Sequence, residues 1–122
     1  MTPKPTEVEL SLLRVLWDLG PATVRQVHEV LSRNRELSYT GILRMLQVMH
    51  EKGLVVRDES ARSHVYRPAH TREAMRAGLV SDLLDKAFGG SAADLVLAAL
   101  RSGRVSATER RAIRALLEGK QP

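Results

Sequence analysis

The segment Ser38–Pro68 constrains the fold of this chain most strongly, because it joins an amphipathic helix directly to two short strands. Apolar residues recur at helical spacing after Ser38 until Gly53, a residue type that commonly ends helices. Leu54–Asp58 and Ser63–Pro68 are short runs rich in β-branched or aromatic residues, and the polar turn at Glu59–Arg62 between them predicts a hairpin. The segment is therefore predicted to be a helix followed at once by a hairpin.

Two shorter helices are predicted before this segment. Thr6 and Glu9 have the spacing of a capping box, which begins a helix that runs to about Leu19. Thr23 caps a second helix that runs to about Ser32. A polar connection then leads to the third helix.

Three helices followed by a hairpin is the order of a winged helix-turn-helix, in which the third helix enters the DNA major groove and the hairpin contacts the flanking backbone. Ala22 is expected to add a short strand to the hairpin. Three further capped helices are predicted after Pro68, ending near residues 88, 102 and 117. The expected fold is mainly α with a small β-hairpin: a winged-helix DNA-binding domain over residues 1–70 and a helical dimerisation domain over residues 71–122.

Composition excludes several classes of protein. The chain has no cysteine, which rules out disulfides and thiolate metal sites. It has no apolar run near the roughly 20 residues that a membrane span needs and no signal-peptide pattern, so we expect a soluble, cytoplasmic protein without a membrane partner. The net charge of +5 permits a polyanionic partner without requiring one.

The outward face of the third helix carries side chains that suit DNA bases. Thr40, Arg44 and Gln47 form one stripe, and Arg can read guanine, Gln adenine and the Thr methyl group thymine. The opposite, inward face is expected to hold Tyr39, Ile42, Leu46 and Met49. The alternative is that this stripe is the ordinary solvated face of a surface helix.

The N-terminus of the same helix offers a phosphate site, because its free backbone N–H groups and the Ser38 hydroxyl point to one end. Gly41 lies on the exposed face, where it destabilises a helix by roughly 1 kcal/mol relative to Ala. Close approach of another molecule would explain this glycine, and so would neutral drift.

The hairpin is basic. Arg57, Arg62, His64 and Arg67 lie along it, and alternation puts Arg57 on the opposite face from Val56. Arg62 in the turn is placed to reach backbone phosphates, although charged hairpins also keep sheet edges soluble. The expected DNA-binding residues are Ser38, Tyr39, Thr40, Gly41, Arg44, Gln47, Arg57, Arg62 and His64.

No catalytic centre is expected, and the chain is not predicted to be an enzyme. It has no phosphate-binding glycine loop and no nucleophile paired with a base. His50, His64 and His70 lack metal-ligand spacing, so neither a metal nor a cofactor is expected. Asp82 and Asp85 lie three residues apart, which leaves a small Mg²⁺-dependent nuclease as a remote alternative.

The second half of the chain is predicted to form a homodimer. Its apolar stripes include Met75, Leu79, Leu83, Leu97 and Leu116, and so short a helical segment with one aromatic residue does not easily bury them alone. Pairing with an identical copy solves this and creates a two-fold axis, which predicts a palindromic operator. The alternative is that these helices pad the winged helix within a monomer.

The chain resembles the penicillinase-repressor (BlaI/MecI/CopY) family of bacterial transcriptional repressors along nearly its whole length. The segments that carry the resemblance are Glu7–Gly20, Pro21–Arg25, Ser38–Thr40, Glu51–Leu54, Val65–Pro68 and Leu83–Ser91.

The resemblance implies a homodimer that binds a dyad operator through a recognition helix at Tyr39–Lys52 and blocks transcription. It also implies a sensor protease or another signalling protein as a partner. The chain has Gly41 and Val48 where the family often has Thr and a polar residue. It has Ala98-Ala99 where the antibiotic-responsive branch is cut at an Asn-Phe bond, and the absence of cysteine excludes copper sensing through thiolates. A winged helix that binds a protein instead of DNA remains the rival interpretation.

Overall fold

The computed structural model describes residues 4–33 and 37–120 of the chain. The first helix, α1, spans Glu7–Leu19. The predicted capping box is confirmed, since the Glu9 N–H donates to the Thr6 hydroxyl and the Thr6 N–H donates to the Glu9 carboxylate at 2.9 Å. Gly20 ends the helix with a φ of 83°, a left-handed value that favours glycine.

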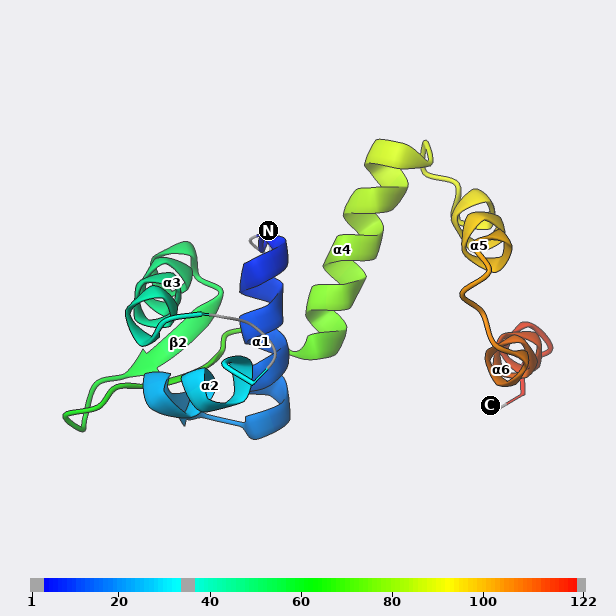
Figure 1. The fold of residues 1–122 in the computed structure, drawn as a ribbon. Coiled ribbons are helices and arrows are strands. Elements are labelled where there is room, and N and C mark those ends of the chain that lie inside the picture. The colour runs from blue at the N-terminus through cyan, green and yellow to red at the C-terminus, as the bar shows by residue number, and fades with distance from the viewer. Residues whose placement is uncertain (1–3, 34–36, 121–122) are drawn as a thin grey trace. The chain divides into compact units, whose positions relative to one another are not determined.

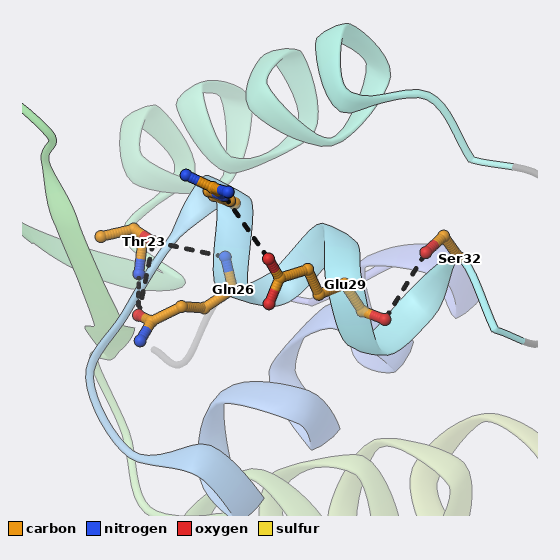
Figure 2. Close-up of polar contacts among 5 residues, drawn as sticks. Thr23, Gln26, Glu29 and Ser32 are labelled. Atoms are coloured by element: carbon orange, nitrogen blue, oxygen red, sulfur yellow. Dashed lines mark hydrogen bonds and ion pairs between the residues drawn. The ribbon is translucent and has the colours of Figure 1, made fainter.

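Helix α2 spans Val24–Leu31 and begins at a second capping box, in which Thr23 and Gln26 satisfy each other's backbone N–H groups (Figure 2). Helix α3 spans Tyr39–Lys52, begins at Ser38 as predicted and ends at Gly53, whose φ of 81° is again left-handed. The polar connection predicted between the two helices falls mostly on residues 34–36, which lie outside the described residues.

Three short strands form one antiparallel sheet within the described ranges. They are β1 at Ala22–Thr23, β2 at Val55–Asp58 and β3 at Val65–Pro68, in the order β1-β3-β2. The predicted strand at Ala22 is confirmed, with Ala22 opposite Tyr66 in the central strand. Figure 1 shows α3 running beside β2, so α3 and the hairpin belong to one body.

The core of this body is built from aliphatic side chains and one tyrosine. The large side chains with at most 2% of their surface exposed come from the first four helices, the sheet and the residue before β2: Leu12, Leu13, Leu16, Val27, Ile42, Leu46, Met49, Leu54, Val55, Tyr66 and Met75. Tyr39 was predicted to face inward with Ile42 and Leu46, but 49% of it is exposed. It is the first residue of α3, one turn beyond the part of the helix that covers the core.

The rest of the chain is helical, as predicted. Helix α4 spans Arg72–Ala87, α5 spans Ala92–Arg101 and α6 spans Ala107–Leu117. Two compact units divide within α4, between Leu79 and Val80. A functional division between residues 70 and 71 stays a prediction. No helix in the described part of the chain is long and apolar enough to cross a membrane.

Candidate nucleic-acid interface

The stripe predicted on α3 lies on its outward face. Thr40 and Arg44 are exposed and Gln47 is half-buried, whereas Ile42 and Leu46 on the opposite face have no exposed surface. The helical period of 3.6 residues produces this separation, because positions 40, 44 and 47 recur one turn apart. The side chains that suit base edges therefore point away from the core.

The N-terminus of α3 is capped by Ser38, whose hydroxyl oxygen accepts the Gly41 N–H at 2.9 Å. A serine hydroxyl that accepts a hydrogen bond still has its own O–H to donate, so Ser38 remains able to bind a phosphate oxygen. The structure also gives a local reason for Gly41, because an added Cβ there would lie 3.0 Å from the Ser38 hydroxyl oxygen. The glycine keeps the cap uncrowded.

Tyr39 lies at the edge of this surface. Its ring packs edge-to-face on His28 of α2, with ring centroids 6.0 Å apart and planes at 73°. Aromatic rings favour this geometry, which restricts the tyrosine while leaving about half of it exposed. Tyr39 is thus placed beside the stripe and not beneath it.

A hollow of about 510 Å³ brings α3 and the hairpin together with the start of α2. The predicted residues Tyr39, Gln47, Arg57, Arg62 and His64 all line it. Its other lining residues are Thr23, Val24, Arg25, Leu43, Ser63 and Tyr66. The hollow is basic, since three arginines and a histidine line it and no acid does.

A second hollow lies along the same face of α3. Arg44, Gln47, Val48, Glu51 and Arg57 line it together with a histidine of the same helix. Gln47 and Arg57 line both hollows, so they stand between the two. Ser38, Thr40 and Gly41 line neither hollow.

Arg57 has an unexpected orientation. It stands directly opposite Tyr66 in the ladder between β2 and β3, and paired residues point to the same side of a sheet. Since Tyr66 is buried, Arg57 lies on the inward side with 21% of its side chain exposed, and Val56 is the exposed neighbour. Its hydrogen bond with Tyr66 raises the pKa of Arg57, and the Glu59 carboxylate raises it further.

The contribution of α2 to this surface was not among the predictions from the sequence. Arg25 lines the larger hollow, 82% of its side chain is exposed, and it pairs with Glu29 one turn later at 3.5 Å. The predicted pairing of Ala22 with the hairpin could have indicated this contribution, because it brings the residues after Ala22 toward the hollow beside the hairpin. Glu59 was likewise not singled out, although it contacts Arg57 at 3.1 Å.

A helix with an exposed polar face, a basic hairpin beside it and two supporting helices define a winged-helix protein. A sequence model described as Penicillinase repressor matches residues 5–119. The chain belongs to this penicillinase repressor family, which is a family of transcriptional repressors and not of enzymes.

The similar proteins agree with this assignment. Transcriptional regulator BlaI from two strains of Mycobacterium tuberculosis (CDC 1551 / Oshkosh and ATCC 25618 / H37Rv) is 42% identical over 82 residues, which make up 66% of this chain. The match spans 59% of the length of those relatives.

Two solved structures share the fold. One is the monomeric form of Bacillus licheniformis BlaI in complex with the blaP half-operator, with 25% identity and a TM-score of 0.52 over 60% of this chain and 89% of that one. The other is the DNA-binding domain of the repressor BlaI, also 25% identical, with a TM-score of 0.53 over 59% and 88%.

Proposed function

We propose that this protein is a homodimeric transcriptional repressor that binds a palindromic operator in double-stranded DNA and blocks transcription in the bacterial cytoplasm. The observation that carries the proposal is the basic hollow shared by α3 and the hairpin, with Gln47 and Arg57 in its lining. A major groove about 12 Å wide admits one helix, and cations beside that helix meet the phosphates that flank the groove. The likeness to a BlaI bound to a half-operator supports the same role.

The proposal assigns a role to five residues of the interface. Arg44, Gln47 and Thr40 read base edges, because they lie on the outward stripe of α3. Ser38 with the free N–H groups of the first turn, and Arg62 in the hairpin turn, bind phosphates. Phosphate contacts fix the register of the protein on DNA, and base contacts select the operator.

A signalling protein, such as a sensor protease, is the proposed source of release. Ala98 and Ala99, the residues that stand where antibiotic-responsive relatives are cut, lie inside α5 and are exposed. Proteases act on extended segments, so cleavage here requires α5 to unwind first. Limited proteolysis followed by mass spectrometry would show whether this bond is cut when the sensor is present.

The test of the proposal is footprinting of DNA from upstream of the gene across a salt series. Two protomers that make about six to eight phosphate contacts give a slope of log K against log[salt] near −5 to −7. We expect a footprint with dyad symmetry whose half-sites lie one or two helical turns apart. Weak binding without sequence preference would contradict operator recognition, and no duplex affinity at low salt would favour a protein-binding winged helix.

A further inference from the structure

The acid in the hairpin turn contacts two basic side chains that line the larger hollow. One oxygen of Glu59 lies 3.1 Å from Nη2 of Arg57 and 4.0 Å from Nε2 of His64. Both of these residues line the hollow. Arg44 and Arg62, by contrast, form no ion pair within the part of the chain that the structure describes. Glu59 therefore neutralises Arg57 and leaves Arg44 and Arg62 without a carboxylate partner among the described residues.

Arg57 is incompletely satisfied by this contact. Its Nε is buried and has no hydrogen-bond partner among the described residues, although Nη2 is paired with Glu59. A buried N–H group without an acceptor is destabilising, because it has lost its water and gained nothing in return. An arginine in this state is stabilised by any ligand that offers hydrogen-bond acceptors to both Nε and Nη2.

We propose that Arg57 binds a DNA backbone phosphate, and that the Glu59 carboxylate occupies its guanidinium in the free protein and is displaced when DNA binds. This inference rests on the proposed function. A phosphate offers several oxygens and matches the planar edge of a guanidinium, so Nε and Nη2 both gain acceptors once Arg57 turns toward the DNA. Glu59 thus acts as an internal competitor that lowers affinity for all sequences alike.

The hairpin is built so that Glu59 is free to leave. The turn is held by its neighbour Asp58, whose carboxylate accepts the Ser60 N–H at 2.9 Å. This hydrogen bond lowers the pKa of Asp58 and does not involve Glu59. The substitution Glu59→Gln therefore removes the competing charge while the turn stays formed.

The experiment measures binding of the full-length protein to a short mixed-sequence duplex labelled with fluorescein, across a salt series. We expect Glu59→Gln to tighten binding about twofold to fivefold per protomer, the range that one partly exposed ion pair provides. The slope of log K against log[salt] should stay the same, because Arg57 neutralises one phosphate per protomer in both proteins. Glu73→Gln, an equal charge change at an exposed position in the first turn of α4, is the matched control and should change neither value.

A double-mutant cycle separates displacement from general electrostatics. In an Arg57→Gln background, Glu59→Gln should have almost no effect, since the cation that it blocks is gone. An equal gain in both backgrounds would overturn the proposal, because Glu59 would then act only as a distant negative charge. No gain from Glu59→Gln alone would overturn it as well, whether or not Arg57→Gln folds. A wild-type protein without duplex affinity would instead overturn the proposed function together with this inference.

Discussion

Side chains around α3 divide into those that hold the helix in place and those left free for a ligand. Lys52 at the end of α3 pairs at 2.6 Å with Glu9 of α1, and 7% of the Glu9 side chain is exposed. The same carboxylate accepts the Thr6 N–H and so also belongs to the cap of α1. Arg44 in the middle of α3 is exposed and belongs to the outward stripe. Lys52 thus holds α3 against α1, whereas Arg44 is exposed for the contact with a base that we propose.

The pH dependence of stability follows from Glu9. Burial raises the pKa of Glu9, but hydrogen bonds from Lys52 and the Thr6 backbone outweigh it, so the pKa lies below its ordinary value of 4.5. A lowered folded-state pKa stabilises the protein above the unfolded pKa, and this contribution is lost as pH falls through the folded value. Glu9→Gln should lower the free energy of unfolding at pH 7 by about 1–2 kcal/mol. This value allows for the weakening of the ion pair by solvent around the exposed Lys52.

The measurement is thermal unfolding of both proteins from pH 7 down to pH 3. The difference between the wild type and Glu9→Gln should begin to shrink below the ordinary value of 4.5 and disappear as the pH falls through the lower pKa of Glu9 in the folded protein. Glu7→Gln, an acid of the same first turn that is exposed, is the control and should give a smaller difference at pH 7. A gap between wild type and Glu9→Gln that stays constant with pH would contradict the role of the Glu9 charge.

Base recognition is assigned to Arg44. Arg44→Ala should weaken operator binding by about 1–3 kcal/mol per half-site and relax the preference at one base pair, since a bidentate contact to guanine would be lost. Arg62→Ala should weaken all sequences alike and reduce the salt slope by about 1. Affinities for operator variants with single substitutions distinguish the two effects. A uniform loss from Arg44→Ala across the variants would remove it from the base-reading set.

At the scale of elements, the start of α4 belongs to the winged-helix unit. The Trp17 indole N–H donates to the carbonyl of His70 at 3.0 Å. Arg72 lies 5.6 Å from the centre of the same ring and pairs with Asp18 at 2.6 Å. Met75, one turn further on, is 2% exposed and is part of the core. The first two turns of α4 therefore close the DNA-binding body, although they follow the hairpin in sequence.

This packing predicts the effect of truncating Met75. Met75→Ala should destabilise the N-terminal unit by about 2–5 kcal/mol, because it leaves a cavity among buried aliphatic side chains. Arg76→Ala, at the exposed neighbouring position, should change stability by less than about 0.5 kcal/mol. Chemical unfolding followed by circular dichroism measures both. Equal, small effects would mean that α4 begins outside the core.

Element boundaries were predictable from capping residues, whereas the orientation of side chains at the edges of elements was not. Thr6 with Glu9 and Ser106 with Glu109 form the capping boxes that their spacing indicates. Alternation correctly separates Arg57 from Val56, but the register against the buried Tyr66 decides which of them points inward. Register depends on the partner strand, so a single strand's sequence does not contain it.

At the scale of the whole molecule, the two compact units differ in how far their apolar side chains are buried. The N-terminal unit buries a continuous core, whereas α5 and α6 contain no buried residue in the part of the chain that the structure describes. The exposed apolar side chains beyond residue 79 are Val80, Leu83, Val96, Leu97, Leu116 and Leu117. Exposed apolar residues gathered in a short segment are typical of an interaction surface, which supports the proposed dimer.

The proposed dimer predicts that a charge on the exposed face of α5 weakens the association of two protomers. Leu97, in the middle of α5, is 44% exposed, and Leu97→Lys should place a charge where a second copy packs. By two-fold symmetry the substitution acts twice, so the loss is about 3 kcal/mol, or roughly a hundredfold in the dimer dissociation constant. Leu19→Lys is the matched control, because it adds the same charge at a leucine of the N-terminal unit that is 49% exposed.

Sedimentation equilibrium across a concentration series gives the dissociation constant of each variant. Leu97→Lys should sediment as a monomer at concentrations where the wild type and Leu19→Lys are dimers. Its operator affinity should then fall toward that of one half-site, since the two recognition helices no longer share one binding event. A monomeric wild type with the same dyad footprint would contradict this link, because it would show that the two half-sites fill without contact between protomers.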